Sequence, residues 1–105
     1  MSSIDVEFDL DEKLKTKSRV FVLFYASWCP FSQRFLPIFN MYARDNPEKC
    51  LRVMIDDKEE LCEKYSVEYY PTVILFERGT VKKRLDATPG AGLNEKQLKK
   101  LVNES

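Results

Sequence analysis

The most informative absence in this sequence is histidine, of which the 105 residues contain none. Catalysis by a Cys-His or Ser-His pair, a Cys₂His₂ zinc site and a histidine pH switch all need an imidazole, so all three are excluded. Charge of one sign is lacking too, because 17 basic residues balance 17 acidic ones. Without a net charge, electrostatic binding to nucleic acid or to a membrane surface is disfavoured.

Long hydrophobic runs, internal repeats and low-complexity tracts are missing as well. No apolar run approaches the roughly 18 residues that a membrane helix needs, and the N-terminus lacks the pattern of a signal peptide. A content of 44% hydrophobic and 32% charged residues is typical of one folded core at this length. We therefore expect residues 1–105 to form a single domain that is monomeric and cytoplasmic.

Cysteine is scarce, and the number of cysteines is odd. Cys29, Cys50 and Cys62 are too few for a disulfide scaffold and leave at least one thiol unpaired, which suits a reducing compartment. Their spacings, with no second ligand nearby, are not those of a metal site, so we expect no metal and no cofactor. Cys50 and Cys62 are interpreted as buried or incidental thiols.

The spacing of apolar residues predicts alternating strands and helices. The segment 20–26 is apolar without alternation, which is typical of a strand covered on both faces. Further strands are predicted at 4–6, 51–55, 72–76 and 81–85, the last of them polar and typical of a sheet edge. Helices are predicted at about 9–17, from Pro30 to Asp45, after the Asp57–Glu60 capping pattern, and after Asn94. This order implies a small central sheet with helices on both faces.

One cysteine stands where the strand at 20–26 gives way to the next helix. Pro30 suits the first helical position, because its missing N–H loses no partner there, and this places Cys29 at the helix N-terminus. Unpaired backbone N–H groups and the helix dipole favour a thiolate at this position, and the thiolate is the nucleophile in disulfide exchange. The position therefore nominates Cys29 as a reactive thiol, with a small buried apolar residue as the alternative.

The segment around this cysteine resembles the active-site segment of the thioredoxin family. The resemblance rests on Tyr25-Ala26-Ser27-Trp28-Cys29, on Pro37, and on Tyr70-Pro71-Thr72 before a strand. It continues through Ile55-Asp56 and Leu75–Gly79, and covers the chain from about residue 10 to the end. The resemblance implies an α/β thioredoxin fold, in which a small mixed sheet is flanked by helices on both faces.

The resemblance also implies roles for individual residues. Cys29 corresponds to the attacking cysteine, and Trp28 to the aromatic residue that packs beside it. Pro71 corresponds to a cis-proline whose loop offers backbone pairing to an extended substrate. The substrate-binding residues expected on this basis are Trp28, Pro30, Phe31, Tyr70 and Pro71.

The second cysteine of the family is Ser32 in this chain. A dithiol protein resolves its mixed disulfide by internal attack, which a serine hydroxyl cannot perform. We place Ser32 with Cys29 in the expected catalytic pair, because its hydroxyl could donate a hydrogen bond to the Cys29 sulfur. Two explanations stay open: a natural monothiol protein, or an engineered replacement of the resolving cysteine, made to trap a partner or to prevent disulfide formation.

Two further departures from the family concern the surroundings of the site. Leu23 stands where the family usually has a buried acidic residue associated with proton transfer to the resolving cysteine; packing in a buried strand is the alternative reason for a leucine. The stretch Asp86–Gly92 replaces a shorter glycine-containing one beside the substrate groove. It either reshapes the groove or is a surface insertion.

The resulting prediction is a thiol–disulfide oxidoreductase in which Cys29 attacks the disulfides of protein substrates. Turnover would need an external electron donor, either a thioredoxin-reductase-like enzyme or a low-molecular-weight thiol. The alternative is a non-catalytic module that binds peptides in the same groove, which Leu23 and Ser32 both favour. A monothiol glutaredoxin with an iron–sulfur cluster is disfavoured, because proline follows Cys29 where that family has glycine.

Overall fold

The computed structural model of the chain describes residues 4–5, 14–56 and 59–104. Within these residues, five strands form one mixed sheet in the order β1-β3-β2-β4-β5. β1 and β2 both run parallel to β3, whereas β4 is antiparallel to both β2 and β5. The strands are β1 (Ile4–Asp5), β2 (Arg19–Tyr25), β3 (Cys50–Met54), β4 (Thr72–Glu77) and β5 (Thr80–Asp86).

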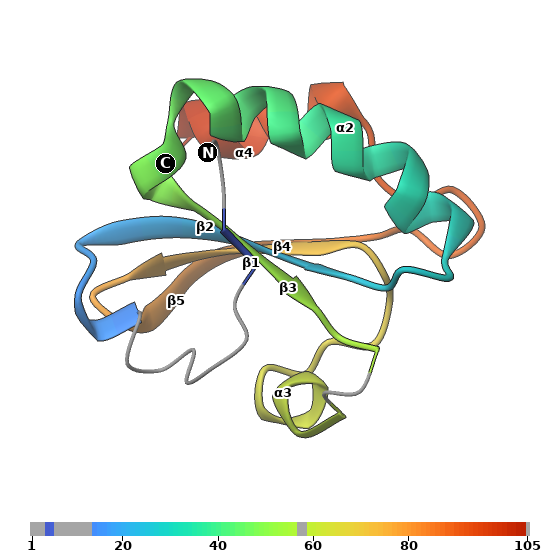
Figure 1. Cartoon of the computed structure of the whole chain (residues 1–105), viewed down its shortest axis with the longest axis horizontal. Coiled ribbons are helices and arrows are strands. Elements are labelled where there is room, and N and C mark those ends of the chain that lie inside the picture. The colour runs from blue at the N-terminus through green and yellow to red at the C-terminus, as the bar shows by residue number, and fades with distance from the viewer. Residues whose placement is uncertain (1–3, 6–13, 57–58, 105) are drawn as a thin grey trace.

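Helices cover both faces of this sheet (Figure 1). α2 (Pro30–Asp45) and α4 (Glu95–Glu104) lie over one face, and the shorter α3 (Glu59–Lys64) lies on the other. A 3₁₀ turn at Pro47–Lys49 leads from α2 into β3. The predicted α/β architecture, a small mixed sheet with helices on both faces, is therefore confirmed. The helix predicted at about 9–17 falls largely outside the described residues, as does Asp57 of the predicted cap.

The central strand β2 is buried on both faces, as its unbroken apolar run predicts. Side chains alternate between the faces of a strand, and six of the seven β2 residues are buried. Val20, Val22 and Phe24 belong to the core on the side of α3. Phe21, Leu23 and Tyr25 belong to the core beneath α2 and α4. The two cores share this strand, so it sets the position of everything that follows it.

The helix that follows β2 presents a stripe of buried residues to the sheet. Phe35, Phe39 and Ala43 are spaced four residues apart, as one face of a helix requires, and each is fully buried. Ser32 continues the stripe toward the helix start and is also buried. The stripe therefore fixes how the first turn of α2 faces the sheet.

The last helix begins with the capping box that its sequence predicts. The Gln97 backbone N–H donates to Asn94 Oδ1, and the Asn94 backbone N–H donates to Gln97 Oε1, both at 2.9 Å. Each of these bonds satisfies a backbone donor at the start of α4 that has no partner within the helix. Leu98 and Leu101 then bury the apolar side of α4 against the core.

Replacing Asn94 by alanine should lower the free energy of unfolding by about 1 kcal/mol, because one cap donor loses its acceptor. Denaturant unfolding of the two proteins measures the difference. Asn94→Asp keeps the acceptor oxygen and serves as the matched control, with stability expected near that of the unmodified chain. Equal stability of the alanine variant would contradict this role of the cap.

Candidate active site

Cys29 is the N-cap residue of α2, with extended backbone angles (φ −86°, ψ 121°) and Pro30 in the first turn. Its N–H donates to the Ala26 carbonyl at 3.3 Å, and its carbonyl accepts the first bond of the helix from the Gln33 N–H at 3.0 Å. The predicted position at a helix start is therefore what the structure shows. The side chain makes no capping hydrogen bond to the helix, however, and the residue is 7% exposed.

The Cys29 sulfur lies instead against the loop before β4. Sγ is 3.8 Å from the Tyr70 carbonyl oxygen, within hydrogen-bond distance for a thiol donor. The following Tyr70–Pro71 peptide bond is cis. Two segments 41 residues apart in the sequence thus meet at the Cys29 sulfur. Because a thiolate has no proton to donate, this contact belongs to the thiol form, and the carbonyl is released when the proton leaves.

Two aromatic side chains stand beside the sulfur. Trp28 and Tyr70 pack edge to face, with ring centroids 6.0 Å apart and an interplanar angle of 88°. Trp28 is 64% exposed, so this pair forms an apolar wall at the protein surface. The far end of Tyr70 reaches α3, where its hydroxyl oxygen lies 3.6 Å from Cys62 Sγ. This hydrogen bond, reinforced by burial, raises the pKa of the Tyr70 hydroxyl to about 12.

Ser32 occupies the site as predicted, but its hydroxyl does not have the partner we expected. Its Oγ accepts a hydrogen bond from the Ala26 N–H at 3.2 Å, and the residue is 1% exposed. Within the described residues, the structure records no hydrogen bond from Ser32 to the Cys29 sulfur. The reason is that β2 ends at Tyr25 and leaves the buried Ala26 N–H in need of an acceptor.

The turn before Cys29 is held by one side chain from the loop after β3 and one from α2. Asp56 accepts hydrogen bonds from both the backbone N–H (2.9 Å) and the hydroxyl of Ser27. The Gln33 side-chain amide donates to the Ser27 carbonyl at 2.8 Å. Sequence reasoning used Asp56 only as part of the family resemblance and missed Gln33 altogether. The contacts fix the backbone that carries Trp28 and Cys29.

The loop that departs from the family pattern packs against the first turn of α2. Thr88 and Gly92 form an antiparallel bridge within it. A Cβ placed on Gly92 would come within 2.9 Å of Phe31 Cβ, so only glycine allows this approach. Arg34 contacts both the loop and Phe31. Its side chain donates a hydrogen bond to the Ala91 carbonyl, and its Cζ lies 5.4 Å from the centre of the Phe31 ring. The loop is therefore part of the wall around the site and not a free insertion.

Comparison with family models matches residues 3–104 to the family described as Thioredoxin. The chain belongs to the thioredoxin family. Among curated proteins, it is 34% identical over 97 residues to a thioredoxin of Mycoplasmoides gallisepticum, covering 90% of this chain and 97% of that one. It is also 34% identical over 92 residues to the human endoplasmic reticulum resident protein 44, covering 80% of this chain. The chain spans only 22% of the length of that relative.

Solved structures of thioredoxins superpose on nearly the whole chain. The oxidised thioredoxin of Plasmodium falciparum matches with a TM-score of 0.82 at 23% identity, covering 97% of this chain and 96% of that one. The thioredoxin of Fasciola hepatica matches with a TM-score of 0.74 at 28% identity, covering 90% and 86%. The fold described above is thus that of the family.

The remaining thiols of this thioredoxin-family chain differ from each other. Cys50 is fully buried in the core beneath α2 and α4, and burial raises its pKa to about 12, so its interpretation as a buried thiol is confirmed. Cys62 is partly exposed and contacts Tyr70 of the candidate site, which its interpretation as incidental did not foresee. Leu23 is fully buried in the same core as Cys50, where it serves packing.

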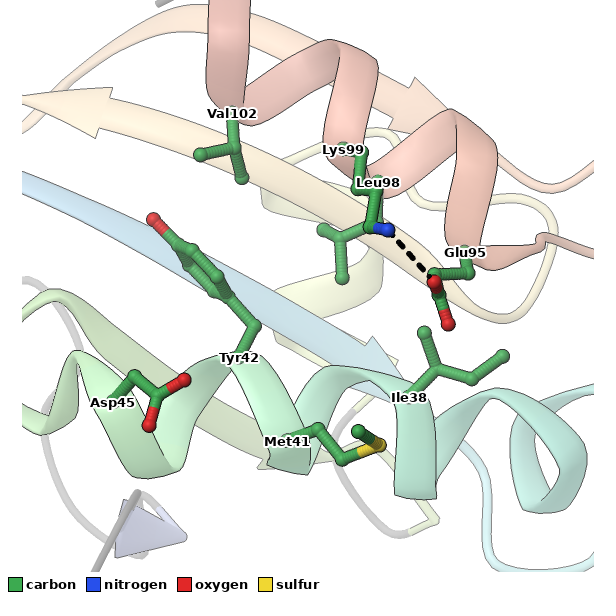
Figure 2. A pocket seen from close by; sticks show the side chains of 8 residues that line it. All are labelled: Ile38, Met41, Tyr42, Asp45, Glu95, Leu98, Lys99 and Val102. Atoms are coloured by element: carbon green, nitrogen blue, oxygen red, sulfur yellow. Dashed lines mark ion pairs between the residues drawn. The ribbon is translucent and has the colours of Figure 1, made fainter.

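A surface hollow lies away from Cys29, between the C-terminal half of α2 and α4 (Figure 2). It has a volume of about 280 Å³, and an ion pair between Lys99 and Glu95 closes one side of it. No thiol lines it. Within the described ranges, no three metal-ligating side chains come together, and no helix is long and apolar enough to cross a membrane.

Substituting alanine for Gly92 should destabilise the protein more than the same change at Gly90. Both residues have positive φ, +74° and +80°, so both alanines cost about 1 kcal/mol of backbone strain. Only at position 92 would the added Cβ also collide with Phe31, whereas Gly90 has open space around it. We expect a further loss of about 1–3 kcal/mol for Gly92→Ala, measured by denaturant unfolding. Equal losses would show that the Phe31 contact does not matter.

Cys50 should make the protein less stable at alkaline pH. Its thiol has a pKa of about 12 when folded against an ordinary value of 9.0, so the unfolded chain loses this proton first as the pH rises. Stability therefore falls between those two values. Cys50→Ala should show a shallower decline of the unfolding free energy over this range. The comparison uses the slope, which the cavity left by alanine does not alter, and identical slopes would contradict the prediction.

Proposed function

We propose that this chain is a thiol–disulfide oxidoreductase in which Cys29 attacks disulfides of protein substrates and becomes joined to them. The observation that carries the proposal is the meeting of Cys29, at the start of α2, with the Tyr70 carbonyl before Pro71. A nucleophile at a helix N-terminus beside an open backbone carbonyl can bind an extended peptide and react with it. Membership in the thioredoxin family supports this function.

The first step follows from the contacts of the sulfur. Loss of the Cys29 proton breaks the hydrogen bond to the Tyr70 carbonyl, which then accepts an N–H of the extended substrate. The Cys29 thiolate attacks one sulfur of the substrate disulfide, R–S–S–R′. The products are the mixed disulfide Cys29–S–S–R and the thiolate R′–S⁻, so electrons balance without a further reagent. Trp28 and Tyr70 supply the apolar wall beside the reacting sulfur.

The second step needs a thiol from outside the chain. Ser32 carries no sulfur, and its hydroxyl is engaged by the Ala26 N–H. An external thiolate R″–S⁻ attacks the Cys29 sulfur, forms Cys29–S–S–R″ and releases R–S⁻; a second external thiol then frees Cys29 as R″–S–S–R″ forms. The donor is a low-molecular-weight thiol or a thioredoxin-reductase-like enzyme. The mixed disulfide is accordingly long-lived.

The cytoplasmic location and the monomeric state stay predictions of the sequence. Relatives of this chain include bacterial thioredoxins and proteins named as residents of the endoplasmic reticulum. The proposal requires only that the compartment holds a thiol able to release the product.

Reduction of insulin disulfides tests the proposal, with the chain compared to Ser32→Cys and Cys29→Ala. Without added thiol, we expect the chain to form a covalent adduct with insulin, visible by intact mass, and to reduce less than one equivalent. Ser32→Cys should release the product, because the introduced thiol attacks the Cys29 sulfur internally. Turnover with a reductant should rise at least tenfold, since an internal thiol acts at a high effective concentration.

The Cys29→Ala variant separates covalent chemistry from simple binding. It should form no adduct. In a pull-down with oxidised insulin, it should capture much less substrate than the unmodified chain does. Undiminished capture by Cys29→Ala would instead support the non-catalytic peptide-binding module. An adduct that forms through Cys62 would count against the assignment of Cys29, and peptide mapping of the adduct identifies the cysteine used.

A further inference from the structure

A second thiol, that of Cys62, contacts Tyr70 of the Trp28–Tyr70 pair. It comes from the face of the sheet opposite α2. Cys62 belongs to α3, which lies on the face of the sheet away from α2 (Figure 1). Its sulfur is 3.6 Å from the Tyr70 hydroxyl. The same tyrosine contacts Cys29 through its backbone carbonyl and Trp28 through its ring. Tyr70 therefore joins α3 to the reactive thiol.

The hydrogen bond with Cys62 is well placed to control the Tyr70 ring. Tyr70 is partly exposed and packs against the core on the side of α3. Its aromatic neighbour Trp28 is 64% exposed and gives its ring little support. A terminal hydrogen bond fixes the far end of a tyrosine, whose near end is set by the backbone. Holding both ends keeps the ring at right angles to Trp28.

We infer that Cys62 is a positioning residue, which holds Tyr70 in the orientation that an extended protein substrate meets. This inference rests on the proposed function, and it names the residue that fixes the orientation of the Tyr70 ring. Side chains that are already held in place bind a peptide at a lower cost in conformational entropy. A small disulfide touches only the sulfur of Cys29 and gains little from such side chains. Cys62 should therefore raise selectivity for peptide disulfides over small ones.

The surroundings of Cys62 make it suitable for substitution. It lines a surface hollow of about 350 Å³ together with Ser66 and Val67, and no residue of α3 is fully buried. Shortening its side chain therefore removes the contact with Tyr70 without emptying the centre of the core. Serine at the same place keeps a group that can donate to or accept from the tyrosine hydroxyl.

The test measures the rate at which Cys29 forms a mixed disulfide with a peptide disulfide and with hydroxyethyl disulfide. In Cys62→Ala, the ratio of the peptide rate to the small-disulfide rate should fall about fivefold, the effect of one hydrogen bond of ordinary net strength. Cys62→Ser should restore most of the ratio. NMR of carbon-labelled tyrosine should show the pKa of Tyr70 falling in Cys62→Ala from about 12 toward 10.0; Tyr70→Phe assigns the signal.

Leu61→Ala is the matched control, because Leu61 neighbours Cys62 on α3 and packs against the same core. It should lower stability without changing the rate ratio or the Tyr70 titration. An unchanged ratio in Cys62→Ala, or an equal fall in Leu61→Ala, would overturn the inference. If the unmodified chain forms no mixed disulfide through Cys29 with either reagent, the proposed function itself fails, and the Tyr70 titration still reports whether Cys62 holds the ring.

Discussion

The antiparallel pairing of β2 with β4 brings the two halves of the candidate site together. Phe24 pairs with Thr72, so the end of β2 and the beginning of β4 lie side by side in the interior of the sheet, at the same end of the two strands. Cys29 follows the first strand by four residues and Tyr70 precedes the second by two. Alternate side chains of β2 pack into two different cores, and this packing holds the register. The contact between sulfur and carbonyl inherits its geometry from the core.

The turn from β2 into α2 needs acceptors for backbone groups that neither element satisfies. Ser32 supplies one for Ala26, and Asp56 supplies one for Ser27. A hydroxyl oxygen is a better acceptor than a thiol sulfur, which is only weakly polar. Serine at position 32 thus suits the buried N–H of Ala26 well, while it removes the group that would release a bound substrate. Under the proposed function, the Ser32 side chain that stabilises the turn would also lengthen the life of the mixed disulfide.

Features that depend on neighbours in the sequence could be predicted, and those that depend on tertiary contacts could not. The burial of β2, the cap at Asn94 and the place of Cys29 at a helix start follow from short-range patterns of apolar, capping and proline residues. The acceptor role of Ser32 required knowing that the Ala26 N–H lies within its reach. The approach of Gly92 to Phe31 joins segments far apart in the chain. The approach of Cys62 to Tyr70 spans only eight residues, but it depends on how α3 is followed by the loop before β4. A lone cysteine in a short helix gives no sign of its partner.

A site without a second thiol to resolve the mixed disulfide depends on other side chains for release of the substrate. In a dithiol protein, the second thiol releases the substrate. The contacts around the first sulfur therefore have little influence on how long the substrate stays attached. Under the function proposed here, the release rate depends on how readily an external thiol reaches Cys29, a residue that is only 7% exposed. The wall of Trp28 and Tyr70, and the loop that packs on Phe31, flank that approach. Under the proposed function, the side chains that select the substrate therefore also shield the disulfide bond to Cys29.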